Sequence, residues 1–324
     1  MKEIMILPAD CNAWGQACIN AYNLVKKEIE VDGAKIHLFG RKRSFGKKYW
    51  STAPYTGDGG VILNNQSNTI NVINAIDKEI PIQEQKYILL KTRDNFFEGV
   101  DKRIIVNKSF CNLVLDIRGD ADYVWTQKIS SKTRNQIRKG LKQKIRVVIG
   151  REELLGDFYK VISKVWLDLG TPTHSQLFFR EIIKCFGEHA SFIIVYYNNQ
   201  PVATALLIIR ENTIFHPFAG TIRSFNPLSI NNVLYWKIIE FACENQLEYF
   251  DMGKSPKNKG TYRFKISWGT EPIQLYYNFF TTNIKTIPDY HNSQLTQLAV
   301  KYWKKMPLPL ANLFGPKLIY NVLL

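Results

Sequence analysis

The stretch that decides the fold is residues 248–278, which read EYFDMGKSPKNKGTYRFKISWGTEPIQLYYN. Residues 249–252 predict a strand that stops at Gly253, and residues 274–280 predict a second, aromatic strand. Between them, Thr261 can cap a short helix after a lysine-rich loop. Free amides and the helix dipole would add to the lysine charges, so the loop is suited to holding an anion. The residues alone leave open a solvated loop beside an ordinary core helix.

Several parts of this stretch carry a family resemblance. In order they are residues 250–255 (FDMGKS), 260–265 (GTYRFK), 268–269 (WG), 271–272 (EP) and 275–277 (LYY). Together they resemble the C-terminal signature of the FemAB-like acyltransferases, relatives of the acetyltransferase (GNAT) superfamily found in cell-wall and extracellular-polysaccharide systems. The resemblance implies a mixed α+β fold of two tandem GNAT-like units and an N-acyltransferase activity.

Length and charge set the class of protein. A chain of 324 residues suggests two domains, and a formal net charge of +15 predicts attraction to polyanions. The five cysteines are scattered and form no CxxC pair, which indicates that they are reduced and that the protein is cytoplasmic. We see no signal peptide and no run of about 20 apolar residues that would span a membrane.

Periodicity divides the chain into two units and a tail. We predict a first GNAT-like repeat over 1–128, a second, catalytic repeat over 129–290 and an amphipathic tail over 291–324. The patterns predict helices over 12–30, 68–79, 131–143, 154–169, 175–186 and 232–245, and strands over 34–39, 47–53, 87–91, 111–116, 191–197, 202–210 and 213–218. Residues 36–39 and 49–53, joined by a basic turn over 40–46, align weakly with 192–195 and 203–209, which suggests a duplication.

The helix predicted at 131–143 carries cations without acidic partners. Arg134, Arg138 and Lys142 recur at every fourth position, and Lys132 and Lys139 flank them. Like charges at this spacing repel, so we interpret the helix as facing a phosphate, with a solvated face as the alternative. The tail similarly mixes leucines and lysines, which suits either packing on the domain or contact with a membrane surface.

Several classes of site lack their motifs. The five histidines show no metal-ligand spacing, and no metal site is predicted. There is no GxSxG, P-loop lysine motif or GxGxxG. His174 and His216 could each serve as a base, but a structural role is the alternative that we favour for both.

N-acyl transfer needs an amine that loses a proton, a stabilised oxyanion and two aligned substrates. We assign Lys265 to the developing oxyanion, Tyr262 to a hydrogen bond on the same helix face, and Asp251 to proton acceptance or to orienting Lys265. The predicted substrate- and phosphate-binding residues are Lys132, Arg134, Arg138, Lys139, Arg223, Lys254, Ser255, Trp268 and Tyr276. For Trp268 and Tyr276 packing is the stronger interpretation.

The donor is left between two classes. Where a GNAT enzyme carries a glycine-rich loop for the pyrophosphate of coenzyme A, this chain reads RSFNPLSINN over 223–232. Arg223 is retained, but no glycine lets backbone amides close on a phosphate. No cofactor is predicted to stay bound, and the donor is either acyl-CoA or the aminoacyl-tRNA that Fem-type relatives use.

These observations lead to one function and one alternative. We predict an N-acyltransferase whose two units meet at a cleft lined by residues 131–143, 220–232 and 254–265. The acceptor would be an amine on a nucleotide- or lipid-linked envelope or exopolysaccharide precursor. Expected partners are that phosphate-bearing substrate, tRNA, and the inner face of the membrane through 295–324. The alternative is a degenerate, non-catalytic module that binds RNA or an anionic polymer.

Overall fold

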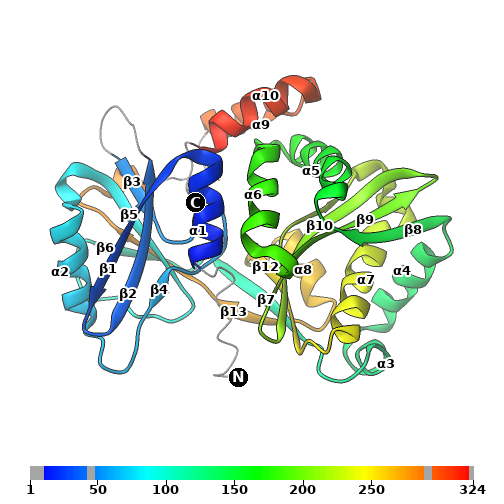
Figure 1. Ribbon diagram of the computed structural model, residues 1–324, viewed down its shortest axis with the longest axis horizontal. Helices are drawn as coiled ribbons and strands as arrows, with labels where there is room; N and C mark the ends of the chain where they lie inside the picture. Colours follow the sequence, from blue (N-terminus) through cyan, green and yellow to red (C-terminus); the bar gives the residue numbers. More distant parts are fainter. Residues whose placement is uncertain (1–10, 42–47, 288–293, 321–324) are drawn as a thin grey trace. The chain divides into compact units, whose positions relative to one another are not determined.

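The computed structural model describes residues 11–41, 48–287 and 294–320. These residues form a mixed α+β fold with two seven-stranded sheets (Figure 1). The chain divides into two compact units: unit 1 holds Met1–Cys111, Ile273–Ser293 and Tyr320–Leu324, and unit 2 holds Asn112–Pro272 and Gln294–Ile319. This division differs from the ranges predicted from the sequence, because strand β7 (Phe110–Asp116) enters unit 2 ahead of residue 129 and strand β14 (Tyr276–Phe280) returns to unit 1 after Pro272.

Unit 1 is a sheet with two helices. The strand order is β1-β2-β3-β5-β14-β6, and β4 pairs with β2. Its elements are α1 (Cys11–Tyr22), β1 (Leu24–Val31), β2 (Ala34–Arg41), β3 (Lys48–Ser51), β4 (Val61–Ile62), α2 (Thr69–Glu79), β5 (Gln85–Thr92), β6 (Ile104–Asn107) and β14 (Tyr276–Phe280). The core is apolar, with Val72, Ile73 and Ile76 of α2 packed in one cluster with sheet residues such as Ile36 and Ile88.

The helix predicted over residues 12–30 is confirmed up to Tyr22 and wrong beyond it. The helix ends at Tyr22, Asn23 takes a φ of +51°, and strand β1 begins at the next residue. A two-residue turn at Asp32 and Gly33, both at positive φ, then joins β1 to β2 in full antiparallel register. Such turns match the twist of a hairpin, and this signal outweighs the weak helical periodicity. The basic turn predicted at 40–46 lies mostly outside the described residues.

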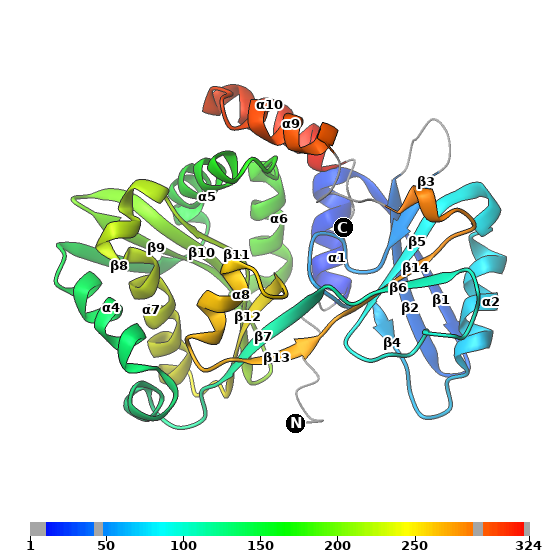
Figure 2. The ribbon, with the colours of Figure 1, turned by 180° about the vertical axis from the view of Figure 1, so that it is seen from behind.

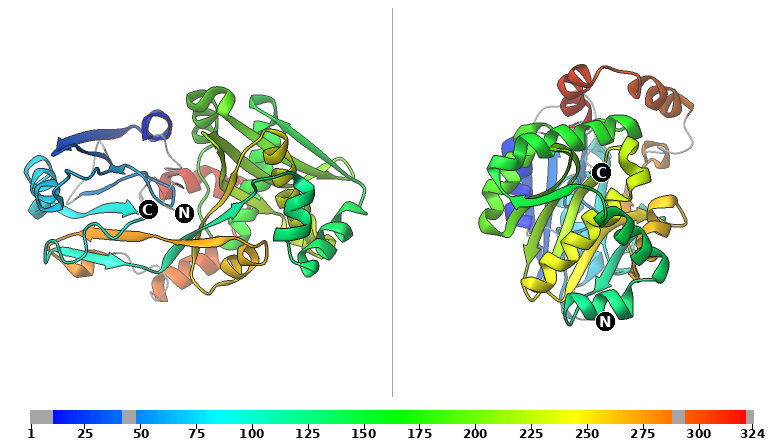
Figure 3. Two further views of the ribbon diagram at one scale, coloured as in Figure 1. Left: turned by 90° about the horizontal axis from the view of Figure 1, so that it is seen from below. Right: turned by 90° about the vertical axis from the view of Figure 1, so that its right-hand side faces the viewer.

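Unit 2 is a sheet covered on both faces. Its strand order is β13-β7-β12-β11-β10-β9-β8. Its strands are β7 (Phe110–Asp116), β8 (Ile145–Gly150), β9 (Ala190–Tyr197), β10 (Gln200–Arg210), β11 (Thr213–Thr221), β12 (Tyr249–Pro256) and β13 (Glu271–Gln274). Figures 1 and 3 show α5 (Leu155–Leu169) and α6 (Gln176–Phe186) on one face and α7 (Ile230–Glu244) with α4 (Ser131–Leu141) on the other.

Most predicted helices and strands of unit 2 are confirmed. Ser130 and Ser175 cap α4 and α6 by accepting hydrogen bonds from backbone amides. Phe178 and Phe179 of α6 are fully buried. Edge strand β8 was not predicted.

The stretch 248–278 departs from its prediction at three points. Strand β12 does not stop at Gly253 but continues to Pro256. Helix α8 (Gly260–Ile266) has Lys259 rather than Thr261 at its N-cap, without a side-chain cap. The strand predicted over 274–280 is two strands in two different sheets, which separate at the buried Leu275.

The topology contains an internal repeat. In unit 1, β1, β2 and β3 are antiparallel neighbours, α2 crosses over, and β5 pairs with β3 in parallel. In unit 2, β9, β10 and β11 are followed by α7 and then by β12, which is parallel to β11. The alignment made from the sequence is therefore offset by one strand, because β1 had been interpreted as helix.

Candidate active site

The two parallel strands β11 and β12 part at the middle of the unit 2 sheet. They pair at only three positions, Thr213 with Tyr249, Ile214 with Phe250 and Phe215 with Asp251. Beyond these pairs β11 continues beside β10 up to Thr221, while β12 runs on to Pro256. Facing backbone groups of parted strands lose their ladder partners and must find others or meet a ligand. Figure 2 shows β11, β12 and α8 at this place.

Asp251 fixes the bend at which β12 leaves β11. Its side chain is fully buried, and Oδ1 accepts a hydrogen bond of 2.7 Å from the amide of Gly253. The other oxygen, Oδ2, lies 3.4 Å from the side-chain amide of Asn112 on β7. Gly253 takes a φ of +73°, which favours glycine. The carboxylate thus positions the main chain of β12.

Lys265 brings a positive charge to the same bend. It is 7% exposed, and its ammonium donates hydrogen bonds to the carbonyl oxygens of Gly253 (3.0 Å) and Lys254 (3.2 Å). Thr270 holds the other end of the residue, since its hydroxyl donates to the Lys265 carbonyl oxygen at 3.0 Å. The side chain of α8 predicted to act on the reacting carbonyl therefore lies where β11 and β12 part.

An aromatic cluster surrounds this charge. Tyr235 of α7 contacts His216 (ring centroids 5.1 Å apart), Phe264 (5.0 Å) and Trp268 (5.7 Å). Burial and, to a smaller extent, the positive charge of Lys265 lower the pKa of His216 to about 3, so the ring is neutral. Burial likewise raises the pKa of Tyr235. This apolar setting strengthens the electrostatic effect of Lys265.

Two buried polar atoms of this cluster have no hydrogen-bond partner among the residues that the structure describes. They are Nε2 of His216 and Nε1 of Trp268, whose residues are 5% and 0% exposed. Trp268 is fully buried among these rings. Tyr235 could not be singled out from the sequence, because one tyrosine among the apolar residues of a helix gives no signal of its own.

The remaining residues assigned near this stretch fall in different places. Tyr262 is half-buried on α8, Ser255 is buried and Lys254 is exposed. Tyr276 belongs to unit 1, where the Lys108 ammonium lies 5.7 Å from the centre of its ring. The seven residues of α8 make about two turns, so its dipole is small.

Helix α4 uses two of its cations internally. The Arg134 guanidinium donates to the carbonyl oxygens of Trp125, Thr126 and Ile129, at the end of a π-helical turn, Val124–Lys128. Arg138 donates to Asn135 and lies 5.2 Å from the centre of the Trp125 ring. Exposed Lys132 and Lys139 make no side-chain hydrogen bond or ion pair with any residue that the structure describes.

Arg223 begins a 3₁₀ helix, η5 (Arg223–Leu228), between β11 and α7. Its side chain is exposed, and Pro227 lies inside the helix. Ser229 follows in the left-handed conformation and does not cap α7; its hydroxyl donates instead to Oε1 of Gln136 on α4 at 2.7 Å. The glycine-free segment is thus a rigid turn, with the uncapped start of α7 behind it.

The three elements expected to line a cleft contact one another within unit 2. Gly140 of α4 packs on the η5–α7 junction, since a Cβ built there would lie 2.9 Å from the Ser229 carbonyl oxygen. Thr133 of α4 donates to the carbonyl oxygen of Ser267, just after α8, at 3.0 Å. These contacts place α4 beside the start of α7 and beside α8, and Tyr235 of α7 contacts Phe264 of α8.

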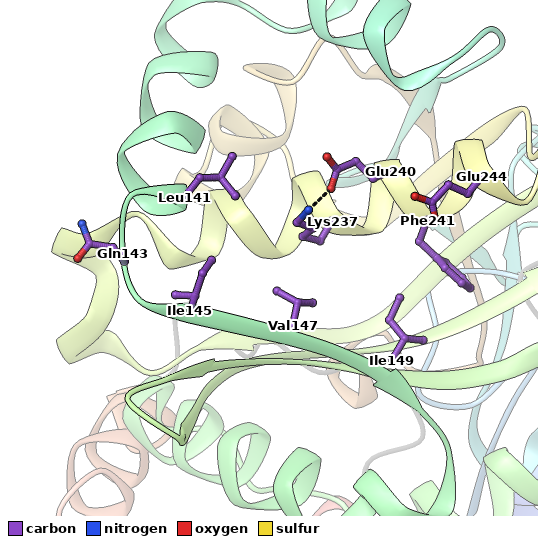
Figure 4. A pocket seen from close by; sticks show the side chains of 9 residues that line it. All are labelled: Leu141, Gln143, Ile145, Val147, Ile149, Lys237, Glu240, Phe241 and Glu244. Carbon is purple, nitrogen blue, oxygen red and sulfur yellow. Dashed lines mark ion pairs between the residues drawn. The ribbon is translucent and has the colours of Figure 1, made fainter.

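An open groove of ≈ 570 Å³ lies elsewhere in unit 2 (Figure 4). Its floor is apolar, formed by Leu141, Ile145, Val147, Ile149 and Phe241, and its rim includes an ion pair of 2.6 Å between Lys237 and Glu240. Strands β9 and β10 separate β8, on which it rests, from β11. It is therefore distinct from the site around Lys265.

Neither a metal cluster nor a membrane span occurs in the described parts of the chain. No three His, Cys, Asp or Glu side chains among these residues gather as a metal site would require. None of the described helices has the length and apolar character needed to cross a bilayer.

Comparison with known proteins identifies the type of fold. Residues 127–265 match the family model described as acetyltransferase (GNAT) domain. A search of curated proteins by sequence finds no match. The matched range ends at Lys265 and includes all of β11 and β12, so Asp251 and Lys265 both lie within the part of the chain that resembles this family.

Solved structures resemble the whole chain at low sequence identity. FemX superposes with a TM-score of 0.60 and 12% identity, covering 89% of this chain and 93% of its own. The C-terminal domain assigned to a lysylphosphatidylglycerol synthetase of Agrobacterium fabrum gives 0.60 and 12%, covering 86% and 90%. A tandem GNAT protein from the clavulanic acid biosynthesis pathway gives 0.53 and 8%, covering 85% and 96%. The predicted fold of two GNAT-like units is confirmed.

Proposed function

We propose that this chain is an N-acyltransferase whose reacting centre lies where β11 and β12 part. The observation that carries the proposal is the buried ammonium of Lys265, held on the carbonyl oxygens of Gly253 and Lys254 within the GNAT-type domain. Parted strands expose backbone groups to a substrate, and a desolvated positive charge beside them favours the negative charge of a tetrahedral intermediate.

The chemistry assigns separate tasks to three side chains. The acceptor nitrogen forms a bond to the acyl carbon, the C–O or C–S bond of the donor breaks, and the proton lost by the nitrogen is taken up by the leaving oxygen or sulfur. Lys265 stabilises the charge that develops on the carbonyl oxygen, and half-buried Tyr262, three residues earlier on α8, donates a hydrogen bond there. Asp251 positions the bend of β12 through the Gly253 amide.

Exposed cations would bind the phosphates of the substrates. Lys132 and Lys139 on α4, Arg223 on η5 and Lys254 on β12 are all exposed, and the elements that carry them contact one another. Arg134 and Arg138, which bind groups of unit 2 itself, would act by holding α4 in place. A polyanionic donor agrees with the net charge of +15.

We propose an activated acyl or aminoacyl donor and an amine acceptor on a nucleotide- or lipid-linked precursor of the cell envelope. One structural neighbour is named for lysylphosphatidylglycerol, an aminoacylated lipid, which supports aminoacyl transfer to a lipid-linked acceptor. The glycine-free η5 segment, with Pro227 inside it, does not fit the usual backbone cradle for coenzyme A pyrophosphate and favours aminoacyl-tRNA.

The experiment is a donor-consumption assay. The full chain is incubated with a cell-envelope extract and either acetyl-CoA or a mixture of radiolabelled aminoacyl-tRNAs, with Lys265→Ala as the matched control. We expect one donor to be consumed, with label moving to an amine of the extract. Consumption no faster than with Lys265→Ala would refute the proposal. RNA binding with a steep salt dependence and without turnover would instead favour the non-catalytic alternative.

A further inference from the structure

Helices α9 (Gln294–Trp303) and α10 (Leu308–Ile319) expose large apolar side chains. Both belong to unit 2, and Figure 1 shows them beside α5. The exposed residues are Leu298, Tyr302, Leu310, Leu313, Phe314 and Leu318. Most large apolar residues of the described chain are buried, so a group of six on two short helices indicates a surface with a partner.

Helix α10 buries its small residues and exposes its large apolar ones, which is the reverse of an ordinary core helix. It buries its small residues: Ala311 is 2% exposed, and Gly315 packs so closely on Thr173 that a Cβ would lie 3.0 Å from backbone atoms. The face at positions 310, 313, 314, 317 and 318 points outward, and Leu313 is 58% exposed. These positions follow the helical repeat, so α10 has one continuous apolar face with Lys317 inside it.

Helix α9 repeats this arrangement. Its inner side rests on the end of α5, where a Cβ on Gly170 would lie 2.5 Å from Val300, and Trp303 is half-buried. Leu298, Lys301 and Tyr302 occupy positions i, i+3 and i+4 of the outer side, and Lys305 lies in the turn that follows the helix; all four are exposed. The segment therefore packs on unit 2 with one side and exposes apolar and basic side chains on the other.

The charge of this segment has one sign. Lys301, Lys304, Lys305 and Lys317 are exposed, and the last acidic residue of the sequence is Asp289. A partner must therefore accept leucine, phenylalanine and tyrosine side chains and also neutralise lysines. A second copy of the chain would not suit, because a two-fold interface would bring the lysines of both copies together.

We propose that the α9–α10 face, formed by the outer residues Leu298, Lys301, Tyr302, Lys305, Leu310, Leu313, Phe314, Lys317 and Leu318, docks on an anionic lipid bilayer. The apolar side chains would enter the boundary between headgroups and acyl chains, and the lysines would reach the lipid phosphates along their flexible stems. The docking does not depend on the acyl-transfer proposal, and it would place unit 2 beside lipid-linked acceptors.

The test is sedimentation of the nuclease-treated full chain with vesicles. Vesicles of phosphatidylcholine with about a third phosphatidylglycerol are compared with pure phosphatidylcholine, at low and high salt. We expect binding to the anionic vesicles that weakens with salt. The double variant Leu313→Gln/Phe314→Gln should bind at least about tenfold more weakly. Lys301→Gln/Lys305→Gln/Lys317→Gln should bind roughly a hundredfold more weakly, at about 1 kcal/mol per lysine.

Matched controls change exposed residues elsewhere. Ile70→Gln/Leu141→Gln and Lys78→Gln/Lys86→Gln/Lys144→Gln remove the same chemistry from other surfaces and should bind like the unmodified protein. Three results would overturn the proposal: no preference for anionic vesicles, variants of the α9–α10 face that bind normally, or a dimer in sedimentation analysis that Leu313→Gln/Phe314→Gln dissociates.

Discussion

The side chain of Lys265 is bound to the main chain of Gly253: its ammonium donates a hydrogen bond to that carbonyl oxygen over 3.0 Å. The bond crosses from α8 to β12, two residues after the last pair between β11 and β12. A residue that the sequence predicts to act in the reaction thus also holds the main chain of β12 through its hydrogen bonds.

This relationship predicts a measurable cost in stability. Lys265→Ala removes the donor for one buried and one partly buried carbonyl oxygen, which should lower the free energy of unfolding by about 1–3 kcal/mol. The exposed neighbour Lys254→Ala should change it by less than about 0.5 kcal/mol. Urea unfolding of both variants measures the difference. Equal stabilities would mean that the hydrogen bonds of Lys265 contribute nothing net.

The cations of α4 should separate into structural and ligand-binding residues. Arg134→Ala should lower the free energy of unfolding by about 2 kcal/mol or more, because three carbonyl oxygens lose a charged donor. Lys132→Ala/Lys139→Ala should leave stability unchanged and reduce the salt slope of RNA binding by about 1–2. Thermal unfolding and filter binding at several salt concentrations test this. Identical behaviour of the two variants would contradict the separation.

Two helical glycines should respond oppositely to alanine. At Gly140 a Cβ would lie 2.4 Å from a methyl group of Val233, so Gly140→Ala should force α4 away from α7 and cost about 1–3 kcal/mol. At Gly156, on α5, a Cβ meets nothing within 4 Å, and Gly156→Ala should stabilise by roughly 0.5 kcal/mol. Denaturant midpoints decide the matter, and a neutral Gly140→Ala would refute the close packing of α4.

Two buried histidines should make unit 2 sensitive to acid. Burial lowers the pKa of both His174 and His216 to about 3 from 6.5. Between pH 3 and pH 6.5 the unfolded chain therefore binds more protons than the folded chain. The free energy of unfolding is highest above pH 6.5 and decreases as the pH falls towards 3. Each histidine should cost about 1.5 kcal/mol between pH 6.5 and 5.

Unfolding measured at several pH values checks this dependence. His174→Phe, in a pocket already lined by Phe178 and Phe218, should remove about half of the slope. His189→Gln, at an exposed position, serves as the control. A slope that is the same in His174→Phe and in the unmodified protein would contradict the assignment.

The sequence predicted unit 2 better than unit 1 for physical reasons. The helices of unit 2 have strong periodicity and serine caps, as at Ser130 and Ser175, and such signals are local. The break at Asn23 and the turn at Asp32 and Gly33 were present but weaker than the apolar pattern around them. Strand β14 returns to unit 1 because it pairs with β5, which lies far away in the sequence, and no local sequence pattern predicts such a pairing.

The site could be predicted only as a set of residues. The motif containing Asp251 and Lys265 indicated the correct strand and helix. It could not show that Arg134 binds the main chain of its own unit, that Tyr276 lies in unit 1, or that Tyr235 closes the cluster. Those facts depend on tertiary contacts between residues far apart in the sequence.

The most direct test of the central claim is the rate of acyl transfer by Lys265→Ala with the donor that the consumption assay identifies. The account predicts a fall in kcat of about 10²-fold or more, with KM little changed. This fall should exceed the loss of activity that the lower stability of the variant would cause. Lys265→Arg should recover part of the rate by restoring the charge. A kcat for Lys265→Ala equal to that of the unmodified protein would contradict the account.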